Sequence, residues 1–191
     1  MPQFELHLTE GALADEAKAQ LMESLSHLLL KMEGAPATEE ALDITWGFLR
    51  EYPAGQWTVG GKPAPSPRYR LVFTVPEGTT GIHGPFQWGR REAFVRKATA
   101  QILAAEGAEL TTVNAGRVWI HILEIPNGHW GSFNELTDVM DIATFIGGPA
   151  VRNPTEKGLR VREELRAAKA ATALTASAAA DVHQLAADAH S

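Results

Sequence analysis

The chain contains an internal repeat with a period of 73 residues. When the sequence is shifted by this distance, residues 30–57 align with residues 103–130 and share ten identities. Each copy of such a repeat is expected to form one supersecondary unit, so the repeat limits the folds open to the chain. The identical pairs are Leu30 with Leu103, Glu33 with Glu106, Gly34 with Gly107, Ala35 with Ala108, Thr38 with Thr111, Trp46 with Trp119, Glu51 with Glu124, Pro53 with Pro126, Gly55 with Gly128, and Trp57 with Trp130.

The first copy reads as strand, helix and strand. Residues 2–9 alternate apolar and polar side chains, which predicts a strand. Residues 14–32 carry an apolar stripe at helical spacing, and Gly34 stands where a helix-ending glycine is usual. Residues 42–50 are predicted to form the second strand. One face of that strand would carry Leu42, Ile44, Trp46 and Phe48.

The second copy opens at Pro67 and repeats the same order of elements. A nearly continuous apolar run over residues 70–75 predicts a buried strand. A glycine-rich loop at 77–89 follows, which the first copy lacks. A helix is expected over 91–105 and a last strand over 118–125. The residues expected to face inward from this helix are Phe94, Val95, Ala98 and Ile102.

Two tandem βαβ units predict the fold class. Crossovers of this length imply parallel strands within each copy and right-handed connections. We therefore expect an α+β (α/β) fold with a four-stranded mixed sheet and two helices on one face. The other face would be apolar and covered by another subunit. The expected domain spans residues 1–148, with repeats at 2–61 and 67–134, and residues 149–191 form an alanine-rich helical C-terminal extension.

Composition argues against several classes of function. The formal net charge of −6 disfavours nucleic acid and anionic membranes as partners. With no cysteine, the chain has neither a disulfide nor a thiolate nucleophile. The seven histidines are scattered, and no nucleotide-binding glycine motif occurs, so we expect no metal and no cofactor. No apolar run approaches the about 20 residues of a membrane span, and a cytoplasmic protein is expected.

The residue with the most reactive potential is Pro2. Removal of Met1 would give it a free secondary amine. Burial and nearby cations lower the pKa of an amine, and a neutral amine at pH 7 can move protons at a carbon next to a carbonyl. Two alternatives remain: proline stands second in many chains for reasons of processing, and if Met1 stays attached, Pro2 is an amide without basicity.

Taken together, these residues resemble the tautomerase superfamily, whose unit is a βαβ fold with a catalytic amino-terminal proline. The similarity rests on Pro2, on Met-Glu-Gly-Ala-Pro at 32–36, on Pro-Ala-Gly-Gln-Trp-Thr-Val-Gly-Gly at 53–61, and on the strand at 118–126. Two fused units resemble cis-3-chloroacrylic acid dehalogenase more than the single-unit 4-oxalocrotonate tautomerase. The resemblance covers residues 2–148 and implies a homotrimer that acts on a small-molecule carboxylate.

The resemblance also implies which residues bind the substrate. Fused relatives place arginines before the second helix, where this chain has Arg90 and Arg91. A guanidinium group is suited to a carboxylate because it can form two parallel hydrogen bonds. Other arginines of the family are missing, since their positions hold Ala12 and, in the second strands, Trp46 and Trp119.

Four further residues are candidates for the site. His121 stands where dehalogenase-like members have an active-site tyrosine, although it is equally readable as a core histidine. Trp130 and its repeat partner Trp57 fall at an aromatic pocket wall, with core packing as the alternative. Arg117 is an alternative anion clamp. No acid of the dehalogenase pattern aligns, because Glu135 is only nearby.

The sequence thus favours a proline-dependent tautomerase or isomerase acting on a small enol or 2-oxo carboxylic acid. Pro2, Arg90 and His121 are the predicted catalytic residues, and Arg91, Arg117, Trp130 and Trp57 are predicted to bind substrate. An alternative on the same fold is a cofactor-independent dehalogenase, hydratase or decarboxylase of a three-carbon acid, with Pro2 as a general acid. A non-catalytic trimeric scaffold is the alternative of another class.

Overall fold

The computed structural model of the chain describes residues 2–77, 88–126, 128–132, 134–137, 141–142, 145–146 and 167. The chain divides into two compact units, Met1–Arg152 and Asn153–Ser191. In the second unit the description covers Ala167 alone, which is helical and exposed. The predicted extension at 149–191 otherwise lies outside the described residues, as does the glycine-rich loop over 78–87.

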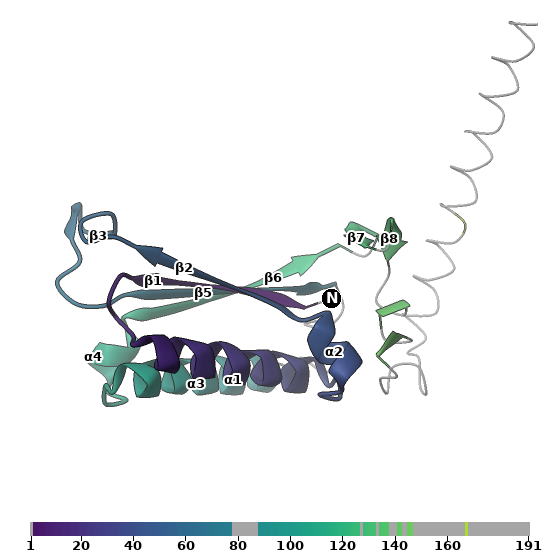
Figure 1. Cartoon of the computed structure of the whole chain (residues 1–191), viewed down its shortest axis with the longest axis horizontal. Helices are drawn as coiled ribbons and strands as arrows, with labels where there is room; N and C mark the ends of the chain where they lie inside the picture. The colour runs from purple at the N-terminus through teal and green to yellow at the C-terminus, as the bar shows by residue number, and fades with distance from the viewer. Residues whose placement is uncertain are drawn as a thin grey trace, which may run out of the picture. The chain divides into compact units, whose positions relative to one another are not determined.

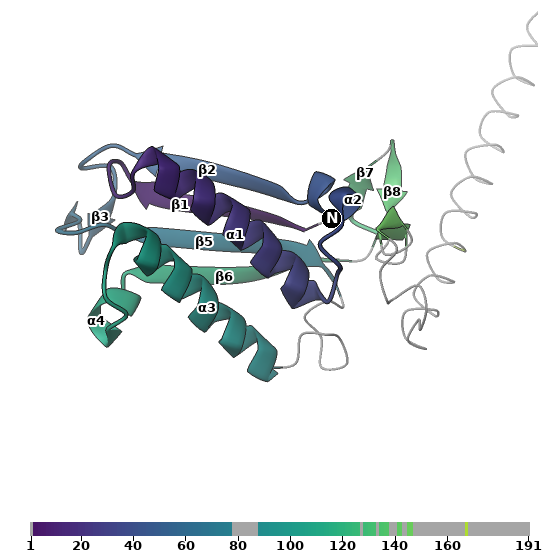
Figure 2. The same ribbon diagram turned by 60° about the horizontal axis from the view of Figure 1, so that its bottom comes forward.

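A four-stranded mixed sheet is the centre of the first unit, as the sequence predicted. Its strands run in the order β2-β1-β5-β6. The outer strands pair in parallel, β2 with β1 and β6 with β5, while β1 and β5 are antiparallel. Both long helices cover the same face of the sheet (Figures 1 and 2). The bounds are β1 Gln3–Thr9, α1 Asp15–Glu33, β2 Trp46–Tyr52, β5 Tyr69–Pro76, α3 Trp88–Glu106 and β6 Val118–Ile125.

The repeat is visible in the backbone as well as in the sequence. A shift of 73 residues superposes the bounds of α1 on those of α3. Gly34 and Gly107 end the two helices with φ of 73° and 75°, a left-handed conformation that favours glycine. After β2 and β6, the Gln56 amide donates to the Pro53 carbonyl (3.0 Å) and the His129 amide to the Pro126 carbonyl (2.9 Å). The two halves are therefore structurally equivalent units.

The core lies between the sheet and the two helices. Alternate residues of β1 and β5 point toward the helices because successive side chains of a strand face opposite ways. Phe73 lies at the centre, with its ring 5.9 Å from that of Phe4 and 4.5 Å from that of Phe94. The residues that were predicted to face inward from the second helix do so, with Val95 half-buried at the edge of the core. Buried core residues include Phe4, Leu6, Leu8, Leu21, Leu25, Leu29, Leu71, Phe73, Phe94, Ala98, Ile102 and Leu103.

One predicted strand begins later than the sequence analysis placed it. Residues 42–45 are not extended, because a short helix, α2 (Glu39–Asp43), precedes β2. The Thr38 side chain caps α2 by accepting a hydrogen bond from the Ala41 amide at 3.2 Å. The second copy has the equivalent helix, α4 (Thr112–Ala115), which Thr111 caps by accepting from the Asn114 amide at 3.1 Å.

Each copy also ends in a small hairpin. In the first copy β3 (Thr58–Val59) pairs with β4 (Lys62–Pro63). In the second, β7 (Trp130–Ser132) pairs with β8 (Glu135–Thr137). Trp130 is therefore the first residue of a strand.

The sheet face away from the helices is open and only partly apolar. Large side chains are exposed at its two edges, Trp46 at 59% and Trp119 at 68%. Its middle is polar, which the expectation of an apolar face missed. There His7 Nδ1 lies 2.9 Å from the Tyr52 hydroxyl, and His7 Nε2 lies 3.2 Å from Glu5 and 3.3 Å from Arg70. No helix among the described residues is long and apolar enough to span a membrane.

Candidate functional site

Pro2 is buried and stands directly ahead of β1. Its carbonyl accepts a hydrogen bond from the Trp46 amide at 3.2 Å, which ties the start of the chain to the start of β2. Because β5 runs antiparallel to β1, Gln3 lies opposite Thr74, and Thr74 in turn lies beside Leu123 of β6. The end of the sheet at Pro2 therefore holds the starts of β1 and β2 and the ends of β5 and β6.

Glu33 lies at this same end of the molecule. It is the last residue of α1, and the α1 crossover returns to the end of the sheet where β1 and β2 begin. Its Oε1 is buried and has no hydrogen-bond partner. Burial raises the pKa of the Glu33 carboxyl to about 7, while the positive charge of the amino terminus lowers it. The sequence analysis did not select this residue, although its identity with Glu106 in the repeat was a usable signal.

The predicted arginines are in the first turn of α3. This helix follows the connection from the end of β5, so its first turn lies at the same end of the sheet as Pro2 (Figure 2). Arg91 is half-buried, and its Nε is buried without a hydrogen-bond partner. The side chain of Arg90 lies outside the described part of the chain.

His121 is exposed on the open face of the sheet, beside Val72. The prediction left open whether it is a core histidine, and the structure places it outside the core. Along β6 it lies two residues further from the Pro2 end than Leu123 does, a distance of about 7 Å. It is thus neighbouring the site rather than packed against Pro2.

The two tryptophans of the repeat lie at opposite ends of the sheet. Trp130 follows β6 and so belongs to the end that holds Pro2 (Figure 1). The hairpin that Trp130 begins borders a hollow of about 460 Å³, lined by Gly131, Ser132, Asn134 and Leu136. Trp57 follows β2 at the other end and packs edge-on against Tyr52, with ring centres 5.6 Å apart.

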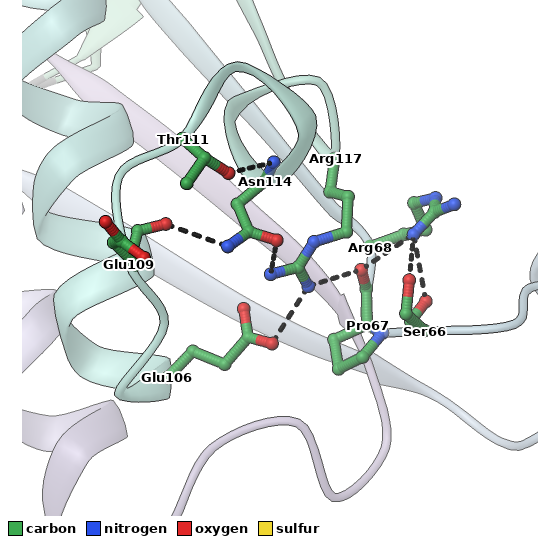
Figure 3. A network of polar contacts seen from close by, with 8 residues as sticks. All are labelled: Ser66, Pro67, Arg68, Glu106, Glu109, Thr111, Asn114 and Arg117. Carbon is green, nitrogen blue, oxygen red and sulfur yellow. Dashed lines mark hydrogen bonds and ion pairs between the residues drawn. The ribbon is translucent and has the colours of Figure 1, made fainter.

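Arg117 is also at the far end, ahead of β6, and there it binds residues of its own chain (Figure 3). Its Nη1 donates to Glu106 Oε1 at 2.8 Å and to the Pro67 carbonyl at 3.1 Å. Its Nη2 lies 3.2 Å from Asn114 Oδ1, to which it donates. Arg117 is buried, and the length of β1 separates it from Pro2, on the order of 20 Å.

The structure thus brings Pro2, Glu33, Arg91 and Trp130 to one end of the sheet, and places Arg117 and Trp57 at the other. A buried carboxyl and a guanidinium group, together with the secondary amine that Pro2 would have after removal of Met1, suit proton transfer on a small anion. Among the residues with described positions, no group of three or more His, Asp or Glu side chains is placed to hold a metal ion.

Comparisons with known proteins give matches in structure only. No protein-family model and no curated protein sequence matches the chain. The structure of Pt0534 inactivated by 2-oxo-3-pentynoate has a TM-score of 0.56 and 22% identity, covering 74% of this chain and 98% of that one. N1, a member of the cis-3-chloroacrylic acid dehalogenase family, has a TM-score of 0.55 and 16% identity, covering 70% and 82%. A symmetric trimer of fused 4-OT, Q0, has a TM-score of 0.52 and 21% identity, covering 74% and 98%.

These similarities show the fold. The chain has the tautomerase-like fold in its fused form, with two βαβ units in one polypeptide. The matched structures are covered over most of their length. The fold expected from the residues of the repeat and from Pro2 is therefore confirmed.

Proposed function

We propose that the protein is a proline-dependent tautomerase that acts on a small enol or 2-oxo carboxylic acid. The observation that carries the proposal is the position of Pro2, which is buried at the start of β1 in a fused tautomerase-like fold. Removal of Met1 gives Pro2 a secondary amine. The first turn of α3, with Arg90 and Arg91, lies at the same end of the sheet and supports binding of an anion.

The reaction needs one proton to move between oxygen and carbon. The Pro2 amine takes the proton of the enol hydroxyl, the C=O bond forms, and the electron pair of the C=C bond moves to carbon. The resulting Pro2 ammonium then protonates that carbon, so the amine is regenerated and no other reactant is consumed. A guanidinium group on the substrate carboxylate holds the carbon in reach of the nitrogen and stabilises the enolate.

Phenylenolpyruvate tests this proposal, because its ketonisation is followed by absorbance. We expect the wild-type protein to catalyse the reaction and Pro2→Ala to lower the rate by about 10²- to 10⁴-fold. Pro67→Ala is the matched control, since Pro67 opens the second copy but is an internal residue. It should keep wild-type activity. Equal rates for wild type and Pro2→Ala would refute the proposal.

A second test examines the amine directly. Pt0534 was inactivated by 2-oxo-3-pentynoate. If Pro2 has a free amine, its nitrogen will add to the triple bond of this compound, with the amine proton moving to the neighbouring carbon. Mass spectrometry should then find one added molecule, located on Pro2. Intact mass must also show that Met1 is absent, because a chain that retains Met1 fits the non-catalytic scaffold instead.

One observation favours a second candidate function. The buried Glu33 carboxyl near the amino terminus would, when ionised, favour a protonated Pro2, which suits a general acid better than a base. A dehalogenase, hydratase or decarboxylase of a three-carbon acid would use Pro2 in this form. N1, which has the same fold, is a member of the cis-3-chloroacrylic acid dehalogenase family. Release of halide from 3-haloacrylates distinguishes this function from that of the isomerase.

The proposal includes a homotrimer. Trp46 and Trp119 are more than half exposed on the open face of the sheet, a cost that a covering subunit removes. The fused 4-OT Q0, which has the same fold, is a symmetric trimer. Copies of this chain are thus the proposed occupants of the face, and they would also supply walls to each Pro2 site.

A further inference from the structure

The surroundings of Glu33 in the first copy of the repeat do not explain how its carboxylate would be neutralised. Its Oε1 is buried and has no partner, although an ionised carboxylate in such a place needs a cation or hydrogen-bond donors. Two influences act on its pKa: burial, which raises it to about 7, and the charge of the amino terminus, which lowers it. The amino terminus is therefore the cation that reaches this carboxyl.

The second copy shows how the same glutamate is neutralised when the chain has no free end there. Glu106 is the repeat partner of Glu33 and receives the Arg117 guanidinium at 2.8 Å. The same guanidinium nitrogen donates to the carbonyl of Pro67 at 3.1 Å, so arginine, glutamate and the opening proline form one cluster (Figure 3). In the first copy, a shift of 73 residues places Ile44 at the position of Arg117. The first copy thus keeps the glutamate and, like the second, has a proline shortly before its first strand, but it has an apolar residue in place of the arginine.

We infer that the Pro2 ammonium takes, in the first copy, the place that the Arg117 guanidinium takes in the second, so that Glu33 is a positioning residue for the Pro2 nitrogen. The inference rests on the proposed function in one respect, the removal of Met1, which leaves the positive charge on Pro2 itself. Glu33 acts through Pro2 and does not touch the substrate. Glu33 holds the Pro2 nitrogen at this end of the sheet and sets how readily the nitrogen loses its proton.

The direction of the effect follows from the charges. A carboxylate next to an ammonium group favours the charged form of the amine and raises its pKa, typically by 1–3 units for a pair within about 4–6 Å. Burial of the amine acts the other way. Without Glu33, burial and the Arg91 guanidinium at the same end of the sheet remain, and both lower the pKa of Pro2.

A titration of Pro2 by NMR, in protein labelled with ¹³C and ¹⁵N proline, tests the inference without any substrate. The Pro2 resonance is followed from about pH 5 to about pH 10 in the full chain. We expect Glu33→Gln to lower the midpoint by about one pH unit or more, a tenfold or greater change in acidity. Glu33→Asp, which keeps the charge, should titrate closer to wild type.

Glu106→Gln is the matched control, because it removes the equivalent carboxyl at the other end of the sheet. Its Pro2 midpoint should equal that of wild type. A midpoint in Glu33→Gln that is unchanged, or one that shifts equally in Glu106→Gln, overturns the inference. If Glu33→Gln fails to fold, Glu33→Asp replaces it in the test. A Glu33→Asp midpoint about one pH unit or more below that of wild type would then overturn the inference, because the aspartate keeps the negative charge.

The result separates this inference from the proposed function. A protein that lacks tautomerase activity but shows the Glu33-dependent midpoint supports the pair and refutes the reaction. A protein that is active while its midpoint ignores Glu33 refutes the pair alone. The pH dependence of kcat/KM gives a second readout, whose limb due to Pro2 should move to lower pH in Glu33→Gln and stay in place in Glu106→Gln.

Discussion

Glu33 and Glu106 occupy one position of the repeat, yet their partners differ. Arg117 donates to Glu106, whereas Ile44 stands at the repeat position of Arg117 in the first copy. An unpaired buried carboxyl binds its proton more tightly than one in water, because burial disfavours the charged form. The repeat therefore pairs one of its two glutamates with a guanidinium group and leaves Oε1 of the other without a hydrogen-bond partner.

The pKa of Glu33 predicts how stability changes with pH in the chain that keeps Met1. Burial raises this pKa from its ordinary value of 4.5 to about 7, so the folded chain binds the proton more tightly than the unfolded chain. For an acid with this shift, stability is full below about 4.5 and falls as pH rises to about 7. The loss at pH 8 is on the order of 3 kcal/mol.

Denaturation by urea at about pH 5 and about pH 8 measures this loss, in a protein made with an N-terminal extension that keeps residues ahead of Pro2. The Glu33→Gln variant of the same protein should lack this loss. The processed chain should lose less than the extended chain, because its Pro2 ammonium lies nearer to the carboxylate. An identical pH dependence in extended wild type and extended Glu33→Gln would contradict the prediction.

Most of the helices and strands could be predicted from the sequence, because the spacing of apolar residues in a segment agreed with the residues that mark its ends. Gly34 ends α1 where expected, and β6 occupies the predicted residues 118–125. The strand predicted at 42–50 started too early. The apolar residues alternate there as in a strand, at Leu42, Ile44, Trp46 and Phe48. Leu42 nevertheless belongs to the short helix α2, which Thr38 caps. A period of two over a few residues does not separate a strand from a short helix.

The candidate site was less predictable than the fold, since it depends on which end of the sheet each residue reaches. Arg117 and Trp130 were both predicted to bind substrate, but they flank β6, so the strand puts them at opposite ends of the sheet. Glu33 belongs to the repeat and to the segment Met-Glu-Gly-Ala-Pro at 32–36. Whether its carboxyl has a hydrogen-bond partner depends on how the folded chain packs around it. Only the structure shows that Glu33 Oε1 is buried and has no hydrogen-bond partner.

Gly47 in β2 provides a prediction on the packing of α1 against the sheet. A Cβ at this position would lie 2.6 Å from Phe4 Cζ and 2.8 Å from Met22 Cε, both closer than carbon atoms approach in proteins. Gly47→Ala should therefore lower the free energy of unfolding by about 1–3 kcal/mol, because Phe4 is part of the core.

Chemical denaturation measures the effect of Gly47→Ala, and two variants control for it. Gly131→Ala in β7 adds a methyl group in open space and should change stability little. Phe4→Leu combined with Gly47→Ala removes the ring atom that is struck, so the double variant should lose less than the sum of the single losses. A fully additive double variant would show that the methyl group and the ring do not meet.

Within the described part of the chain, both long helices cover one face of the sheet and no helix covers the other face (Figure 2). The face combines apolar edges with a polar middle, since Trp46 and Trp119 flank the contacts of His7 with Tyr52 and Arg70. Such a mixed face is typical of a subunit interface, where apolar groups supply binding energy and polar groups set the orientation of the partner.

Trp119→Glu is predicted to disrupt the proposed homotrimer. Trp119 is 68% exposed in the single chain, and burying such a side chain in an interface contributes roughly 1.5–3 kcal/mol for each subunit. A carboxylate there must be desolvated in the interface, which is costly when it has no partner of opposite charge. Size-exclusion chromatography with light scattering should give three chains for wild type and one for Trp119→Glu.

The matched control is Val113→Glu, because Val113 is an exposed apolar residue on α4, at 81% exposure, outside the strands of the sheet. It carries the same added charge and should leave the assembly intact. If the site needs walls from a neighbouring copy, phenylenolpyruvate activity should fall with Trp119→Glu and persist with Val113→Glu. A monomeric Trp119→Glu variant with full activity would show that one chain completes the site, whereas a variant that stays trimeric would place the interface elsewhere.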